Sequence, residues 1–74
     1  MVDGGFMNED TFNMELRKFL KKVGITSQRE IENAVHTSLQ QGIIKGSEKL
    51  EASVTLKIDR IGLVFDIPGM IALE

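Results

Sequence analysis

The spacing of the apolar residues changes once along this chain of 74 residues, and the change constrains what it can fold into. Up to about residue 42 the apolar residues recur every three or four positions, as they do on the buried side of a helix. From Leu50 onward they alternate with polar residues, which is the pattern of a strand with one face in water. The chain is therefore predicted to be α+β, with helical structure first and antiparallel strands after it.

A first helix is predicted from Glu9 to about Val23. Asn8 precedes it and can cap it, because its side-chain oxygen can accept from the unpaired amides of the first turn. Gly24 is placed to end it, since glycine readily adopts the left-handed conformation that closes many helices. The apolar stripe of this helix consists of Phe12, Leu16, Phe19, Leu20 and Val23.

A second helix is predicted to start at Thr26 or Ser27. Ser27 and Glu30 have the spacing of a capping box, in which each side chain accepts from the backbone N–H of the other residue. Gly42 is the predicted stop. The short link centred on Gly24-Ile25-Thr26 predicts a helix hairpin, with Ile25 as an apolar plug between the two helices. The buried stripe of this second helix is predicted to be Ile31, Ala34, Val35, Ser38 and Leu39.

Three strands are predicted after the helices. The first covers about Leu50–Ile58, and the turn Asp59–Gly62 follows it, because Gly62 can adopt a positive φ. Pro68-Gly69 is predicted to be a second break, before a short last strand over residues 70–74. If the first turn has four residues, Leu63, Phe65 and Ile67 lie opposite Ile58, Leu56 and Val54.

The last predicted strand has two possible registers. A two-residue Pro-Gly loop pairs Ile67 with Met70 and turns Ile71 and Leu73 to the outer face. A three-residue loop pairs Ile67 with Ile71 and buries Leu73. Proline at the first loop position cannot adopt the positive φ of the common two-residue hairpin turns, so the longer loop is favoured.

The sum of these elements is an ααβββ fold: a two-helix hairpin packed on one face of a three-stranded antiparallel meander. Residues 1–7 are assigned to a flexible leader and residues 8–74 to a single domain, with Met7 as a candidate for the natural start. A core of this size often contributes a net folding free energy of only ~3–5 kcal/mol. Small domains therefore frequently add disulfides, a metal or a partner subunit. The chain contains no cysteine, which leaves a well-packed core or self-association to stabilise it.

Composition excludes several classes of protein. With no cysteine and one histidine, a zinc site would need carboxylates for most of its ligands. No apolar run is long enough for a membrane span, and the N-terminal stretch lacks the basic and apolar regions of a signal peptide. The default is therefore a cytoplasmic protein with no membrane partner. A net charge of −2 argues against a dedicated nucleic-acid binder, since such proteins usually carry positive charge.

Catalytic and cofactor sites are not indicated. His36 is the single histidine, and no serine or carboxylate is spaced to orient it as a catalytic base. Glu32 lies one helical turn before it and predicts only a surface pair. The carboxylates are scattered, and the glycines fall at predicted turns and helix ends instead of in a phosphate-binding pattern. We therefore expect no enzyme, no metal, no cofactor and no small-molecule substrate.

A cluster of basic residues is the most suggestive functional feature. It lies on the solvent side of the predicted first helix and runs into the predicted corner. One interpretation is a solvated face whose cations complete the helix dipole. The other is contact with an anionic partner, for example DNA read by a helix-turn-helix whose second helix begins at Ser27, Gln28 and Arg29. The candidate contact residues are Arg17, Lys18, Lys21, Lys22 and Arg29.

From Met7 to Glu74 the chain resembles a small bacterial family of uncharacterised proteins, a domain of unknown function. The segment "MNEDTFNMELRKFLKKVGITSQREIE" carries most of the resemblance, and "VTLKID" and the closing "IALE" add to it. The resemblance implies no assigned activity and no site residues. It also favours Met7 as the usual start of the chain.

The favoured hypothesis is a small binding or adaptor domain that acts through protein–protein contacts, with a homodimer as one form. It depends on the small core, the absence of cross-links and the sheet edges that need cover. The alternative is a nucleic-acid-binding module that uses the cationic face of the first helix and the corner between the helices.

Overall fold

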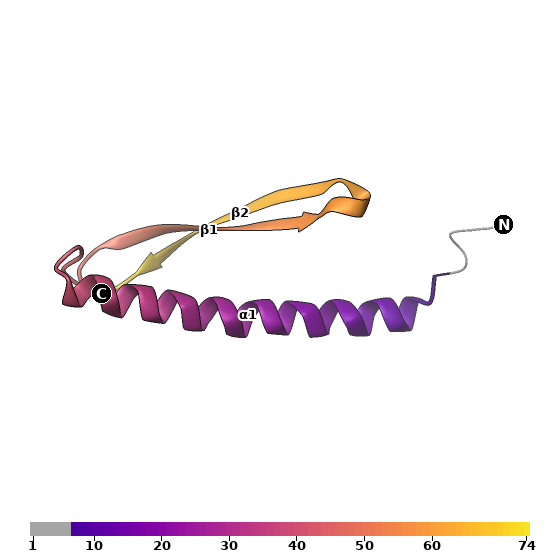
Figure 1. The fold of residues 1–74 in the computed structure, drawn as a ribbon, viewed down its shortest axis with the longest axis horizontal. Coiled ribbons are helices and arrows are strands. Elements are labelled where there is room, and N and C mark those ends of the chain that lie inside the picture. The colour runs from indigo at the N-terminus through magenta and orange to yellow at the C-terminus, as the bar shows by residue number, and fades with distance from the viewer. Residues whose placement is uncertain (1–6) are drawn as a thin grey trace. The chain divides into compact units, whose positions relative to one another are not determined.

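The computed structural model describes residues 7–74, which form one helix followed by a β-hairpin (Figure 1). Helix α1 spans Glu9–Gln40, strand β1 spans Lys49–Ile58, and strand β2 spans Leu63–Ala72. A 3-10 turn, η2, covers Asp59–Ile61 between the strands. The chain divides into two compact units, one that ends at His36 and one that covers Thr37–Glu74. The predicted leader lies outside the described residues except for Met7, which is exposed.

The start of α1 is the one that was predicted. The Thr11 backbone N–H donates to Asn8 Oδ1 at 3.0 Å, and the Phe12 N–H donates to the Asn8 carbonyl at 2.9 Å. Glu9 and Asp10 occupy the first turn, where carboxylates interact favourably with the positive end of the helix dipole. The cap at Asn8 is confirmed.

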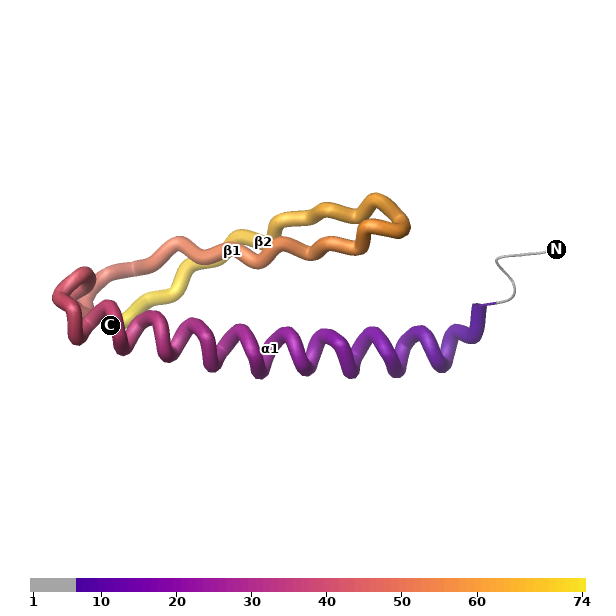
Figure 2. Tube along the Cα trace, viewed as in Figure 1, coloured from indigo at the N-terminus to yellow at the C-terminus, as the bar shows by residue number. Residues whose placement is uncertain are grey.

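The prediction of two helices is wrong, because α1 continues through Gly24-Ile25-Thr26 without a turn (Figure 2). The capping box of Ser27 and Glu30 is therefore not used to start a helix. A glycine inside a helix costs only about 1 kcal/mol relative to alanine. Ending one helix and starting another would leave two sets of backbone groups without helical partners, which is the larger cost.

The apolar pattern also favours an unbroken helix. Phe12, Val23 and Ala34 are spaced by 11 residues, as are Leu20 and Ile31. Eleven residues are about three turns of an α-helix. The apolar residues of both halves of α1 therefore lie on the same side of one straight helix, and the chain needs no turn at Gly24 to bring them together.

The end of α1 at Gly42 is confirmed. Gly42 adopts a left-handed conformation with φ +74°. Its N–H donates to the Leu39 carbonyl at 3.2 Å, and the Ile43 N–H donates to the Ser38 carbonyl at 2.9 Å. These two bonds form a Schellman motif, which satisfies carbonyls that the helix itself leaves unpaired.

The Glu48 carboxylate holds the connection between α1 and β1 through backbone hydrogen bonds. Glu48 accepts from the Lys45 N–H at 2.8 Å and from the Gly46 N–H at 2.9 Å. These two backbone bonds hold the pKa of the Glu48 carboxyl below its usual value of 4.5. Gly46 has φ +104° and lies against the Leu39 side chain, so the connection requires glycine there.

This carboxylate should make the stability of the hairpin unit depend on pH. A lowered pKa in the folded state means that Glu48 contributes stability above its unfolded-state pKa and loses it as pH falls through the lowered value. Glu48→Gln should therefore remove part of the acid sensitivity and leave the chain less stable at neutral pH. Urea unfolding across an acid pH series will check this. An unchanged pH profile in Glu48→Gln would contradict it.

The hairpin follows the predicted register. Ile58 pairs with Leu63, Leu56 with Phe65 and Val54 with Ile67. The turn is the predicted one, because the Gly62 N–H donates to the Asp59 carbonyl at 3.1 Å. Gly62 itself adopts φ +68°, a conformation that glycine adopts without strain.

The predicted third strand does not form, and both registers proposed for it are wrong. Strand β2 runs straight through Pro68 and Gly69, and Ile71 pairs with Leu50 on β1. The described residues therefore contain a two-stranded sheet in place of a three-stranded meander.

The position of Pro68 explains why the strand continues. The Leu73 N–H donates to the Glu48 carbonyl at 3.1 Å, and hydrogen-bonded and non-hydrogen-bonded pairs alternate along an antiparallel ladder. Counting in steps of two from that bond, the pair Ser53–Pro68 is non-hydrogen-bonded. The amide that proline lacks would have pointed away from β1, so no ladder bond is lost.

Candidate functional site

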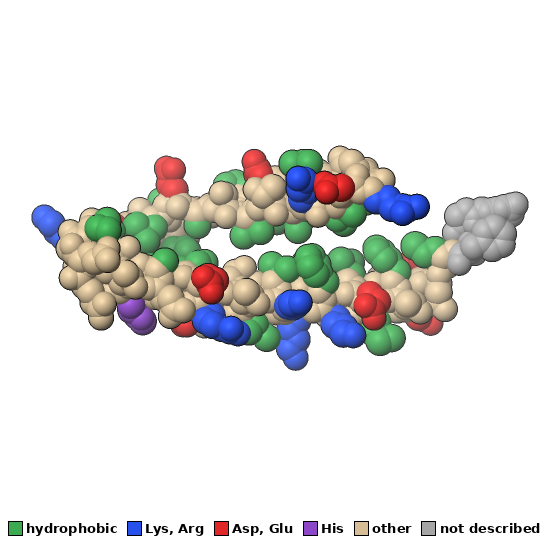
Figure 3. All heavy atoms as spheres, in the orientation of Figure 1, with side chains coloured by type: hydrophobic (Ala, Val, Ile, Leu, Met, Phe, Trp, Pro, Cys, Tyr) green, Lys and Arg blue, Asp and Glu red, His purple; other side chains and the backbone are tan. Residues whose placement is uncertain are grey.

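The five predicted basic contact residues all lie on α1 and are exposed. The side away from Phe12 was predicted for Arg17, Lys18, Lys21 and Lys22, and Figure 3 shows the Lys and Arg side chains of α1 away from most of its hydrophobic side chains. Lys18 makes an exposed ion pair with Glu15 at 4.0 Å, a kind of pair that adds little stability. Lys22 also borders the apolar side, where it lines a shallow hollow with Phe19 and Val23.

The corner proposed for reading DNA is absent. Ser27, Gln28 and Arg29 lie inside α1, so they do not lead a second helix into a groove. Gln28 Nε2 donates instead to Glu32 Oε2 at 3.3 Å, which adds a carboxylate to the cationic side. The nucleic-acid hypothesis is left with the cationic face alone.

No constellation for catalysis or metal binding is found in the part of the chain that the structure describes. His36 is exposed on α1, and Glu32, its predicted partner, is bonded by Gln28. Across residues 7–74, no three histidine or acidic side chains gather closely enough to hold a metal ion. Of the described helices, none combines the length and apolar character that crossing a membrane requires.

The first prominent surface is the apolar stripe of α1, along one side of the helix. Its members are far more exposed than core residues normally are: Phe19 retains 54% of its surface and Leu20 retains 48%. None of the α1 side chains is buried. We define the α1 stripe as Phe12, Leu16, Phe19, Leu20, Val23, Ile31, Ala34 and Val35.

The second surface is one face of the hairpin. The pairing sets the even-numbered residues of β1 beside the odd-numbered residues of β2, and nearly all of them are apolar. Phe65 remains 58% exposed and Ile67 remains 46% exposed. We define the hairpin's apolar face as Leu50, Ala52, Val54, Leu56, Ile58, Leu63, Phe65, Ile67, Gly69 and Ile71.

The opposite face of the hairpin is more polar. On it, Thr55 Oγ1 donates to Asp66 Oδ1 across the strands at 2.8 Å. Lys57 Nζ lies 3.7 Å from Asp59 Oδ1. The sheet therefore has one apolar side and one side suited to water, as the alternation predicted.

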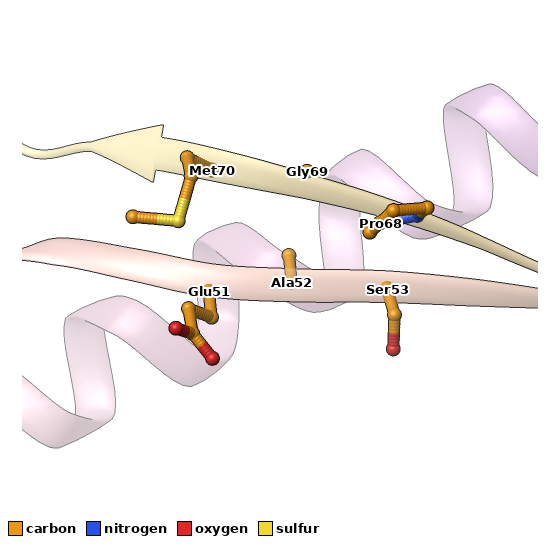
Figure 4. Close-up of a pocket in the computed structure, with 6 residues that line it drawn as sticks. All are labelled: Glu51, Ala52, Ser53, Pro68, Gly69 and Met70. Carbon is orange, nitrogen blue, oxygen red and sulfur yellow. The ribbon is translucent and has the colours of Figure 1, made fainter.

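A shallow hollow lies at the middle of the hairpin (Figure 4). Most of its lining belongs to the more polar face, where the pairs Glu51–Met70 and Ser53–Pro68 flank the small pair Ala52–Gly69. Its one ionisable lining residue is Glu51, so it offers no acid–base pair for chemistry. The lining residues are Glu51, Ala52, Ser53, Pro68, Gly69 and Met70.

The sequence profile of a family of unknown function, DUF6494, matches residues 7–74, which is nearly the whole chain. The chain belongs to this family. No curated protein and no solved structure matches the chain. Membership in DUF6494 confirms the family resemblance seen in the sequence and assigns no activity.

Proposed function

We propose that this member of DUF6494 is a protein–protein interaction module that associates with itself, and that its apolar surfaces form the contacts. The observation that supports this is the lack of a buried core. Across residues 7–74 no side chain is buried. Exposed apolar side chains are ordinary when they are single, whereas contiguous apolar surfaces mark interaction sites.

The stability of each element gives a second reason. An isolated two-stranded hairpin is marginal in water, and three or more strands or a packed neighbour are needed to stabilise it. Helices likewise gain most of their stability from packing of an amphipathic side. Cysteine cross-links are absent and no described residue is buried, so both elements need contacts from elsewhere.

The experiment is sedimentation of the full chain over a range of micromolar concentrations, together with thermal unfolding over the same range. We expect a species with the mass of two chains and a Tm that rises with protein concentration, because association stabilises only the folded form. A single species with the mass of one chain, and a Tm independent of concentration, would contradict the proposal.

Contact with nucleic acid through Arg17, Lys18, Lys21, Lys22 and Arg29 is the second candidate. Their shared, exposed side of α1 supports it. Binding of that kind would weaken steeply with salt, since phosphate contacts release counterions. Titration of labelled duplex and single strands at low salt is the matching measurement, and no binding there would rule it out.

A further inference from the structure

Strand β1 has an unpaired edge. Even-numbered residues of β1 bond with β2, because the ladder alternates from the Glu48–Leu73 bond. The odd-numbered residues therefore turn their N–H and C=O groups away from β2, and their side chains are exposed. The segment contains no proline or glycine. The outward residues are Lys49, Glu51, Ser53, Thr55 and Lys57.

The outer edge of β2 is different. Its outward positions include Pro68 near the middle of the strand (Figure 4). Proline has no N–H to donate to an added strand, and natural sheets use it to block edges. Strand addition to this hairpin is therefore expected at β1 and not at β2.

We propose that β1 pairs antiparallel with β1 of a second copy about a two-fold axis, with Val54 opposite Val54 of that copy. This rests on the proposed function, because it names the partner and adds a strand-edge contact to the contacts of the apolar surfaces. The result is a four-stranded sheet in the order β2-β1-β1-β2.

The alternation of outward and inward backbone groups along β1 limits the registers in which two copies can pair. Outward backbone groups must meet outward backbone groups, so odd-numbered residues pair with odd-numbered ones. Each apolar face then lies on the same side of the joined sheet. Two such registers overlap almost the full length of β1. One sets Ser53 opposite Ser53 of the second copy, and the other sets Val54 opposite Val54 of the second copy.

Charge decides between these two registers. With Ser53 at the centre, Lys49 faces Lys57 of the second copy, and like charges directly opposite are destabilising. With Val54 at the centre, Glu51 faces Lys57 of the second copy, and this pair occurs twice by symmetry. In the same register, Ser53 faces Thr55 of the second copy, and Lys49 reaches the level of Asp59 just beyond the strand.

This contact also limits the assembly to two chains. Once the two β1 edges are joined, both outer edges of the four-stranded sheet belong to β2. Each carries Pro68 at an outward position, which disfavours addition of another strand. A closed dimer is therefore expected, and not an open fibre.

Single cysteines test the register directly, since the chain has none of its own. At a non-hydrogen-bonded pair the Cα atoms lie about 4.5 Å apart, within the range of a disulfide. Val54→Cys should therefore form a covalent dimer under mild oxidation. Ala52→Cys is the matched control on the same face. Its two copies would lie more than about 13 Å apart, so it should stay uncrosslinked.

Charge reversal gives a second test in solution. Glu51→Lys and Lys57→Glu should each raise the dimer Kd about tenfold at low salt, because two attractive pairs become repulsive. An equal mixture of the two variants should form a heterodimer close to wild type in affinity, as should the double variant. Glu32→Lys and Lys21→Glu on α1 make the same changes in net charge and should leave the Kd unchanged.

The outcomes separate the two proposals. A wild-type chain that never dimerises would overturn both. A wild-type dimer in which Ser53→Cys crosslinks and Val54→Cys does not would overturn this register and leave self-association standing. A dimer whose charge-reversal variants are not rescued by mixing would also overturn the contact. Crosslinking at Val54→Cys together with rescue by mixing is the expected result.

Discussion

Phe19→Asp should weaken self-association by a factor of about 10 to 100, since burying a Phe side chain contributes about 1.5–3 kcal/mol and each 1.4 kcal/mol is tenfold in Kd. The aspartate adds to this loss, because a carboxylate placed against an apolar partner has no hydrogen-bond donor. Phenylalanine and aspartate have similar helix propensities, so α1 itself should persist. Sedimentation equilibrium measures the change in Kd, and circular dichroism measures the helix.

Met14→Asp is the matched control for this prediction. Met14 is a large apolar residue of the same helix, and it is 61% exposed against 54% for Phe19. At helical spacing it lies among the cationic residues, away from the α1 stripe. We expect it to change the Kd by less than about 0.5 kcal/mol, as surface substitutions usually do. Equal effects of the two substitutions would mean that the stripe is not the contact surface.

The features that the sequence predicted correctly are local ones. Asn8 caps α1, Gly42 ends it, and Asp59–Gly62 turns the chain between the strands. Each depends on residues only a few positions apart, whose side chains or left-handed conformation satisfy nearby backbone groups. The turn length then fixed the register of the hairpin over its first half, because one residue of slip would exchange its two faces.

The errors arose where a local break signal disagreed with a longer pattern. Gly24 resembled a helix stop, yet the 11-residue spacing of apolar positions continues past it. Pro68-Gly69 resembled a turn, yet Leu63, Phe65, Ile67, Gly69 and Ile71 keep one unbroken alternation across it. In both places the longer pattern was present in the sequence and would have given the observed element.

The candidate surfaces were only half predictable. Periodicity identified which side of the helix and of the first strands is apolar, and it placed the cationic residues on the other side. It could not show whether anything covers the apolar side, because a stripe looks the same in a buried helix and in an uncovered one. The outer edge of β2, with Pro68 on it, was not predicted, because the third strand of the predicted meander would have paired with it.

Gln28→Pro should destabilise the chain by about 3 kcal/mol or more, because proline inside a helix removes a hydrogen bond and clashes with the preceding turn. This substitution separates the one-helix structure from a two-helix chain. If a second helix were capped by Ser27, residue 28 would be its first position, where proline is favoured. Circular dichroism and urea unfolding should show lost helix and lower stability.

Gly24→Ala tests the same continuous helix, and it should raise the stability of the chain where Gln28→Pro lowers it. A Cβ at Gly24 meets no atom within 4 Å, and the residue lies inside α1. Alanine should therefore stabilise the chain by about 1 kcal/mol through helix propensity. At a left-handed helix stop the same substitution would instead destabilise, as it should at Gly42, where φ is +74°. Stabilisation by Gln28→Pro together with destabilisation by Gly24→Ala would favour a corner at this position and contradict the continuous helix.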